Sequence, residues 1–393
     1  MKKFFNYALA LLAVALTSPA LVSCDDDDEV KSYDLTIELV LPEGVQSIKD
    51  LEIKAVKGNK VYNIYQNAVT ATIEDLAQGT YDITVKANVA DDVTAKVQGA
   101  TKVDLYADHV VKIPLSLIYE SPLLFKEIYT AGGKAGYTQD GYFEIVNNSD
   151  EVQYLDQLVL LYASAAQKAP NAWQATGVTD IYYQGQGPVV AFPGGGTDYP
   201  IQPGKSVVIA NDATNHKEAD PDGADNHSDL SKADWEIYLD YSKMGDVDFE
   251  APNLSAIFYN NQYMRAFGLG FFNGAYILAK LPVTPEAYAA EESSYSTTPG
   301  PTSATKYMGI PSKYVLDAVE AWENDESEHY SYFLPKDDAH AVWAAEGWSG
   351  KCIRRKVAKI EDGRVYYKDT NNSSEDFLTG QPQTPGVAPT AVD

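Results

Sequence analysis

The sequence predicts a mainly β protein made of two antiparallel β-sandwich domains. Three observations predict this class. Short segments alternate apolar and polar residues, Gly, Asn and Asp turn signals separate them, and 45% hydrophobic with 22% charged residues is a globular composition. The 393 residues are enough for two domains with cores of their own. We expect the second domain to carry long loops and short helical insertions.

Residues 1–23 have the pattern of a signal peptide, with two lysines before a short apolar run. That run is too short for a bilayer core of about 30 Å, which a helix crosses in about 20 residues. The segment ends in Leu21-Val22-Ser23-Cys24, which resembles the lipobox of bacterial lipoproteins. The resemblance implies that Cys24 is acylated and becomes the first residue of the mature chain. The alternative is an ordinary secreted protein, cleaved after Ala20.

Residues 24–32 are expected to form an extended acidic tether, because densely spaced like charges repel one another. The acidic residues that follow the cysteine are Asp25, Asp26, Asp27, Asp28 and Glu29. This run resembles the surface-export signal of Bacteroidetes lipoproteins. The resemblance implies a lipid-anchored protein of the outer membrane, displayed on the cell surface. The alternative is a solvated spacer that carries no export information.

Residues 33–118 are expected to form the first sandwich. Residues 34–41 alternate strictly between polar and apolar side chains, which is typical of a half-buried strand. Further strands are expected at 51–56, 61–65, 69–73, 81–89 and 109–117. The segment from Asp75 to Val85 resembles the strand entry of prealbumin-like or carboxypeptidase-regulatory-like domains, which implies a spacer module.

Residues 119–393 are expected to form the second sandwich. The expected strands are 123–128, 142–150 with its Glu-x-x-Asn ending, 155–161, 201–210 with its Pro-Gly turn, and 365–368. This arrangement resembles the lamin-tail-type immunoglobulin-like sandwich. Long insertions interrupt it at 164–199, 211–250 and 282–348. Apolar residues at helical spacing predict helices at 312–323 and 336–346.

The order of tether, spacer sandwich and Tyr-rich second sandwich resembles a family of Bacteroidetes lipoproteins of unknown function. This resemblance implies a TonB-dependent transporter as a partner. With 56 acidic and 30 basic residues the chain has a formal charge of −26, which repels a phosphate backbone. We therefore expect no nucleic-acid partner.

No catalytic residue can be nominated. The sequence contains neither the His-Glu-x-x-His pattern of zinc peptidases nor the Gly-x-Ser-x-Gly pattern of hydrolases. We expect a binding protein instead of an enzyme, with a nutrient, a metal complex or a glycan as its ligand. The alternatives are a secreted hydrolase on an unfamiliar β scaffold and a structural or adhesion component of the envelope.

One candidate site is a divalent-cation site in the acidic stretch 211–234. Two imidazoles among carboxylates favour zinc, iron or manganese, while carboxylates alone suit calcium. The candidate ligands are Asp212, His216, Asp220, Asp222, Asp225, His227 and Asp229. A solvated acidic loop that binds no metal is the alternative.

A second candidate site is a set of aromatic rings in a Gly- and Pro-rich insertion. Rings on loops held by a rigid sandwich can stack on sugars, porphyrins or other planar ligands. The candidates are Trp173, Tyr182, Tyr183, Phe192 and Tyr199, from a chain that has 28 tyrosines. The alternative is that these rings pack between strands.

Overall fold

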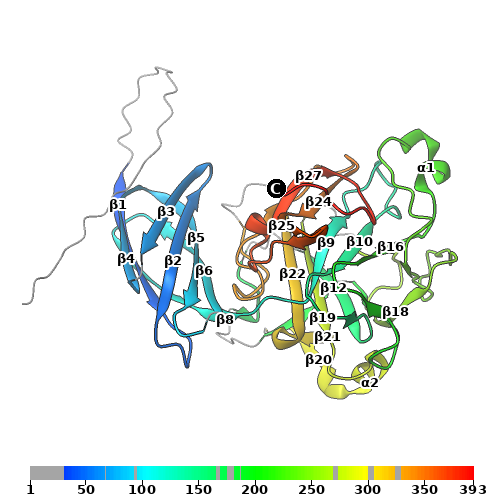
Figure 1. The fold of residues 1–393 in the computed structure, drawn as a ribbon, viewed down its shortest axis with the longest axis horizontal. Helices are drawn as coiled ribbons and strands as arrows, with labels where there is room; N and C mark the ends of the chain where they lie inside the picture. The colour runs from blue at the N-terminus through cyan, green and yellow to red at the C-terminus, as the bar shows by residue number, and fades with distance from the viewer. Residues whose placement is uncertain are drawn as a thin grey trace, which may run out of the picture.

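The computed structural model describes residues 31–66, 68–92, 95–164, 169–174, 181–185, 187–268, 273–299, 305–323 and 329–393. It confirms a mainly β protein with few helices (Figure 1). The signal peptide, Cys24 and the acidic residues 25–29 lie outside the described residues. Within the described part of the chain, no helix is both long and apolar enough to cross a membrane.

The first sandwich consists of two sheets, with strand orders β3-β2-β5-β6-β8 and β4-β1-β7. Strand β1 pairs antiparallel with β4 but parallel with β7. The alternating residues of β1 point into the core, where Leu35 and Ile37 are fully buried. The strands are β1 Ser32–Val40, β2 Ile48–Lys57, β3 Lys60–Gln66, β4 Thr70–Ala77, β5 Gly79–Val89, β6 Lys96–Leu105, β7 His109–Pro114 and β8 Ser116–Ile118.

The second sandwich centres on one long sheet with the order β23-β22-β19-β12-β14-β18-β17-β16-β10-β9-β24-β27. The sheet curls over itself, so Phe125 of β9 and Val319 of β22 share one core. Its first strands are β9 Leu123–Tyr129, β10 Tyr142–Asn147, β11 Gln153–Tyr154, β12 Leu158–Ser164, β13 Tyr182–Gln184, β14 Val189–Ala191, β15 Pro200–Ile201, β16 Ser206–Ala210, β17 Trp235–Ile237 and β18 Asn253–Phe258.

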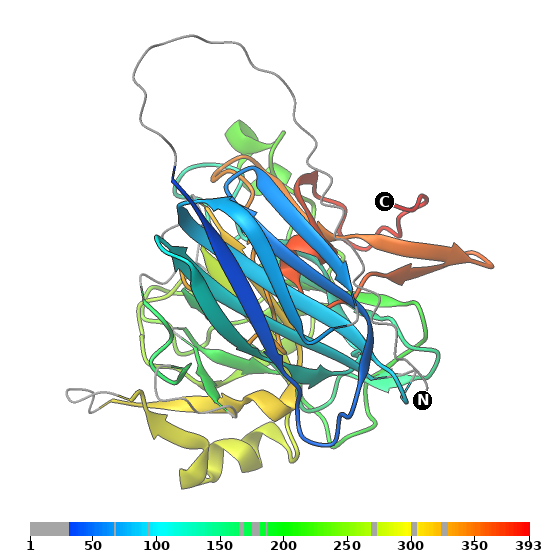
Figure 2. The ribbon, with the colours of Figure 1, turned by 90° about the vertical axis from the view of Figure 1, so that its left-hand side faces the viewer.

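The later strands complete this sheet and form two small additional ones, β13-β21-β20 and β25-β26. The hairpin of β25 and β26 projects from the domain (Figure 2). The strands are β19 Gly274–Lys280, β20 Tyr295–Thr297, β21 Lys306–Pro311, β22 Val315–Trp322, β23 Val342–Trp343, β24 Lys351–Arg355, β25 Val357–Glu361, β26 Arg364–Tyr367 and β27 Phe377–Pro382. Short helices α1 His216–Ala219, α2 Pro285–Ala290 and α3 Ser373–Asp376 lie between strands.

No α-helix forms at 312–323 or 336–346, and the prediction was wrong for both segments, although Ser312–Tyr314 form one short 3-10 turn. Residues 315–322 form strand β22, whose last six residues are all buried. A strand covered on both faces loses the alternation of period two, so its apolar residues can imitate helical spacing. Residues 342–343 form β23, which pairs with β22.

The first sandwich is docked on the second (Figure 1). Lys86 of β5 forms an ion pair of 2.8 Å with Glu375 of α3. The buried amide of Gln98 on β6 donates hydrogen bonds to the carbonyl oxygens of Pro335 and Asn371, at 2.9 and 2.6 Å. These contacts give the first sandwich a defined place against the second.

The Glu-x-x-Asn segment has a structural role. Glu144 is fully buried and pairs with Lys126 at 2.6 Å. The Nζ of Lys126 also donates to the carbonyl of Val387 at 2.8 Å, which fixes the C-terminal segment across β9 and β10. Asn147 donates to the carbonyls of Glu151 and Ile201, at 2.7 and 2.9 Å, and so holds the turns at the end of β10. The buried Glu144 carboxylate needs a charged partner inside the protein, and Lys126 supplies it.

Candidate functional site

The candidate site is a cleft of about 510 Å³ in the second domain. Volumes of about 300 to 1,000 Å³ are typical of small-molecule sites. Its walls come from the ends of β12 and β13, from β21, and from the segments that follow β18, β20 and β22. The described lining residues are Ala163, Asn171, Ala172, Trp173, Gln184, Gly185, Asn260, Thr298, Tyr307 and Tyr332.

Trp173 forms one aromatic wall of the cleft and is half-buried. Its backbone N–H donates to Oδ1 of Asn171 at 2.9 Å, and Nδ2 of Asn171 donates to the carbonyl of Tyr332 at 3.1 Å. The indole packs against Tyr182 with ring centroids 5.7 Å apart. The segment that carries Trp173 is therefore tied to the segment of Tyr332, which holds the ring in place without a ligand.

Tyr332 and Gln184 fix the geometry between the walls. The Tyr332 hydroxyl donates to the Gln184 carbonyl at 2.9 Å and accepts from the Gln184 N–H at 3.2 Å. The Gln184 amide donates to Ser296, and its Oε1 accepts from Thr298 at 2.7 Å. Burial raises the pKa of Tyr332 well above its usual value of 10, so the hydroxyl stays protonated and keeps donating.

Two polar groups of the cleft keep their hydrogen-bonding capacity. Among the described residues, neither the Asn260 amide nor the Tyr307 hydroxyl has a hydrogen-bonding partner. Asn260 is exposed and Tyr307 is half-buried. The amide offers two N–H donors and an oxygen acceptor, and the hydroxyl can donate or accept. The cleft thus combines aromatic walls with polar groups that are free to bind a ligand.

The described lining of the cleft carries no ionisable acid or base other than tyrosine. It therefore lacks a carboxylate, imidazole, amine or thiol that would act as general base or strong nucleophile.

The structure separates the five rings predicted to stack on a ligand. Trp173 lines the cleft, and the Tyr182 ring packs against it without being among the described lining residues. Tyr183 and Phe192 are fully buried in two cores, where no ligand ring can reach them. Tyr199 packs edge-on against Trp235 at 5.0 Å. Tyr183, Phe192 and Tyr199 therefore pack inside the protein, as expected if these rings pack between strands instead of stacking on a ligand.

The sequence interpretation missed most of the cleft. Asn171, Asn260, Tyr307 and Tyr332 lie on four separate segments, and no spacing in the sequence relates them. Asn171 lies two residues before Trp173, so it was the only one of these that proximity to a predicted ring could have indicated.

The second polar grouping lies around His227, where both ring nitrogens face carboxylates and Oδ1 of the buried Asp140 has no hydrogen-bonding partner among the described residues. The Nδ1 of His227 lies 2.6 Å from Oδ2 of Asp140, and its Nε2 lies 3.2 Å from Oδ2 of Asp220. Lys134 forms an ion pair with Asp220 at 2.7 Å. Lys134, and after it His227, lower the pKa of Asp220. Asp140 and His227 are buried, so the network links two loops through the interior.

His216 is also fully engaged. Its Nδ1 lies 2.8 Å from the Tyr137 hydroxyl and its Nε2 lies 3.0 Å from the carbonyl of Asp212. Burial lowers the pKa of His216, so the neutral ring is favoured. Tyr137 packs against the His227 ring at 4.6 Å and joins the two histidines.

The predicted cation ligands do not converge. Asp222, Asp225 and Asp229 are exposed, while both nitrogens of each histidine already have partners. Within the described ranges, no three His, Cys, Asp or Glu side chains form a group that could hold a metal ion. The metal prediction has no geometric support, and its test is a melting experiment with calcium, zinc or manganese after chelation.

A cluster of acids lies beside this network. Burial, with repulsion from Asp246 and Glu236, raises the pKa of Asp212 to about 8. Burial likewise raises the pKa of Glu236 to about 7, although the backbone N–H groups of Phe249 and Ala213 oppose this effect. Protons therefore stay on part of this cluster near neutral pH.

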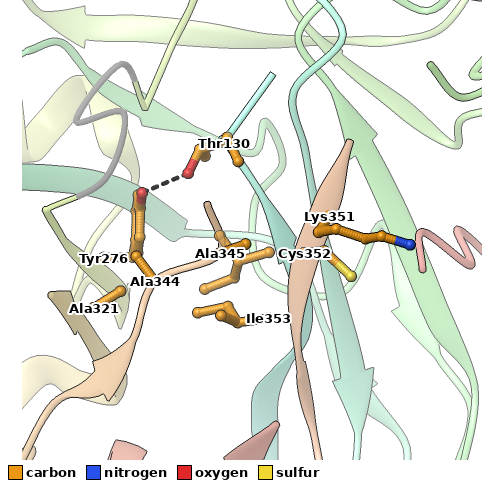
Figure 3. Close-up of a pocket in the computed structure, with 10 residues that line it drawn as sticks. Thr130, Tyr276, Ala321, Ala344, Ala345, Lys351, Cys352 and Ile353 are labelled. Carbon is orange, nitrogen blue, oxygen red and sulfur yellow. Dashed lines mark hydrogen bonds between the residues drawn. The ribbon is translucent and has the colours of Figure 1, made fainter. Parts of the chain in front are cut away.

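Two other cavities of the second domain are too small for a ligand. The one in Figure 3 has about 20 Å³ and is lined by Thr130, Tyr276 and Cys352 among others. The Thr130 and Tyr276 hydroxyls lie 2.7 Å apart. Burial raises the pKa of the Cys352 thiol far above its usual value, which makes it unreactive. A second cavity, beside Asp140, has about 10 Å³. Each can hold about one water molecule.

Fold and cleft together define a mainly β protein of two sandwich domains with a ligand-sized cleft in the second. Residues 202–384 match a family of proteins of unknown function, DUF4876. No curated protein matches the chain.

Two solved structures are similar to the chain. A DUF4876 family protein from Bacteroides thetaiotaomicron VPI-5482 has 26% identity and a TM-score of 0.58, over 92% of this chain and 99% of that one. A candidate cell adhesion protein from Bacteroides eggerthii DSM 20697 has 12% identity and a TM-score of 0.18, over 36% of this chain and 53% of that one. The first similarity extends over both domains.

Proposed function

We propose that this chain is a lipid-anchored binding protein of the outer membrane, displayed at the cell surface, that holds a ligand in the cleft beside Trp173. The single observation that carries the proposal is a cleft of about 510 Å³ with pre-positioned aromatic walls and unused polar groups. Its volume is suitable for a small molecule. The lipobox-like residues before Cys24 support the anchor, and the acidic run 25–29 supports surface display.

The proposed protein binds without turning its ligand over, because the described lining offers neither a carboxylate nor an imidazole for proton transfer. It would serve as an accessory to a TonB-dependent transporter, which receives the nutrient, metal complex or glycan.

The test combines binding with product analysis. Calorimetry with haem, siderophores and glycans should give a ligand for the purified full-length protein, with no product formed. Trp173→Ala should weaken binding by about 1 to 3 kcal/mol if the ring is a central anchor. The matched control is Tyr106→Ala, which removes an aromatic ring that is 61% exposed on the first sandwich.

Turnover of a ligand that a single Asp or Glu substitution abolishes would replace this proposal with the hydrolase. Absence of any ligand would favour the structural or adhesion role. The anchor is tested separately by Cys24→Ala, which should block lipidation and maturation. Wild-type protein found wholly in the soluble fraction, without acyl mass on its first residue, would contradict the anchor.

A further inference from the structure

The described lining of the cleft differs from the rest of the molecule in its charge. The chain has 56 acidic and 30 basic residues, yet none of the ten described residues that line the cleft is among them. Charged side chains are distributed over both domains, as the ion pairs of Lys86 and Lys134 illustrate. A binding site for an anion normally presents Arg or Lys, and a site for a cation presents carboxylates.

The neutral described lining disfavours two ligand classes. The carboxylates of haem and the oxygens of siderophore complexes pair with Arg or Lys, and the described lining contains neither. Haem iron is held by His, Met, Cys or Tyr, of which only Tyr307 and Tyr332 are present, and the Tyr332 hydroxyl is already bonded to Gln184. Acidic polysaccharides would also be repelled by the net charge of −26.

The groups that are present match a sugar ring. A hexose has an apolar face of C–H groups, which can lie on an aromatic ring, and an equatorial rim of hydroxyls that both donate and accept. Trp173 supplies the flat ring and Tyr307 a free hydroxyl. Asn260 supplies an amide that can donate to one hydroxyl and accept from another.

We infer that the cleft binds a neutral oligosaccharide, with one sugar ring stacked on Trp173 and its hydroxyls bonded to Asn260 and Tyr307. This inference rests on the proposed function and names its ligand class. Asn171 and Tyr332 hold the Trp173 loop before the ligand arrives, so little ordering of that loop accompanies binding. A neutral ligand also gives an affinity that depends little on salt, because no ion pair forms.

The experiment titrates the full-length protein with maltohexaose, cellohexaose and mannohexaose, and in parallel with oligogalacturonate and haem. Binding is measured by calorimetry at low salt and in about 0.5 M salt. We expect at least one neutral oligosaccharide to bind with nearly the same affinity at both salt concentrations. Oligogalacturonate and haem should not compete with it.

Three variants locate the ligand. Tyr307→Phe removes one hydroxyl and should weaken binding about fivefold, the effect of one hydrogen bond. Asn260→Ala should weaken it at least as much, and Trp173→Ala by about tenfold or more. Asn260 is exposed, so its variant is expected to fold even if Trp173→Ala does not. Tyr106→Ala is the control and should bind as wild type does.

The outcomes separate this inference from the proposed function. Haem or oligogalacturonate binding that depends on Trp173, with no binding of neutral oligosaccharides, would overturn the inference and leave the proposed function standing. Failure of every probe to bind would overturn both. Neutral oligosaccharide binding that is insensitive to Trp173, Asn260 and Tyr307 would also overturn both, because the ligand would then lie outside the cleft.

Discussion

The cleft beside Trp173 and the network around His227 are both built from polar and aromatic side chains, but they differ in what remains available to a ligand. In the network, each nitrogen of His227 already faces a carboxylate oxygen, at 2.6 Å from Asp140 and 3.2 Å from Asp220. In the cleft, Asn260 and Tyr307 have no hydrogen-bonding partner within the described part of the chain. A dense group of ionisable residues is therefore the less suitable of the two to bind a ligand.

The physical reason for this difference is burial. A buried histidine or aspartate must have partners inside the protein, because an unpaired buried charge costs several kcal/mol. Polar groups that line an open cleft are hydrated in the free protein and exchange water for ligand. The network should therefore contribute mainly to stability, and the free groups of the cleft mainly to binding.

The largest effect is expected for His227→Ala. The substitution removes the closest polar contact of the buried Asp140 carboxylate, which keeps hydrogen bonds from Tyr129 and Gly133, so we expect the free energy of unfolding to fall by about 1 to 3 kcal/mol. Urea denaturation measures it. Asp222→Ala is the matched control, because that carboxylate belongs to the same loop but its side chain is 90% exposed. Equal stability of His227→Ala and wild type would show that the network is not structural.

The next effect is a pH dependence that centres on Asp212. Its pKa is about 8 in the folded protein, against a usual value of 3.8, so the folded state binds more protons than the unfolded state between these values. Stability should therefore fall as the pH rises from about 4 to about 8. Asp212→Asn cannot titrate and should show a smaller fall.

Thermal melting at several pH values between these limits measures this slope for wild type and for Asp212→Asn. Asp222→Asn removes a charge from an exposed position of the same region and should keep the wild-type slope. Glu236, with a pKa of about 7, contributes to the fall that remains. Identical slopes for Asp212→Asn and wild type would mean that Asp212 does not hold its proton.

A smaller effect is expected for Tyr332→Phe, which acts on the support of the cleft. The variant loses the hydrogen bonds between the Tyr332 hydroxyl and the Gln184 backbone, at 2.9 and 3.2 Å, but keeps the ring. We expect a loss of about 1 kcal/mol in the free energy of unfolding. Urea denaturation measures it, and Tyr307→Phe is the control because its hydroxyl has no partner to lose among the described residues. Equal losses in the two variants would contradict the assignment.

How much of this could be predicted depended on the surroundings of each segment. The strands of the first sandwich were predictable where one face is buried and the other faces solvent, as in β1, which buries Leu35 and Ile37. Strand β6 was not predicted. It includes Gly99, where an added Cβ would lie 2.8 Å from both Leu115 and the carbonyl of Pro114. Close packing requires the glycine here, but in a sequence pattern a glycine indicates the interruption of a strand.

The candidate sites were harder to predict, because composition does not show which polar groups are already paired. The sequence places His216 and His227 among aspartates, but Asp140 and Tyr137, which engage them, lie about 75 to 90 residues earlier. Trp173 could be nominated from its Gly- and Pro-rich surroundings. Tyr307 and Asn260 could not, because only the packing of β21 and of the segment after β18 brings them to the same cleft.

The smallest effect on stability is expected for Asn260→Ala, and it gives the sharpest contrast with His227→Ala. The Asn260 side chain is exposed and has no hydrogen-bonding partner among the described residues, so its removal leaves no buried group unpaired. The free energy of unfolding should change by no more than about 0.5 kcal/mol. Urea denaturation of both variants, run side by side with wild type, measures the contrast. A large loss for Asn260→Ala would mean that the amide supports the fold, and the cleft would then have one group fewer to offer a ligand.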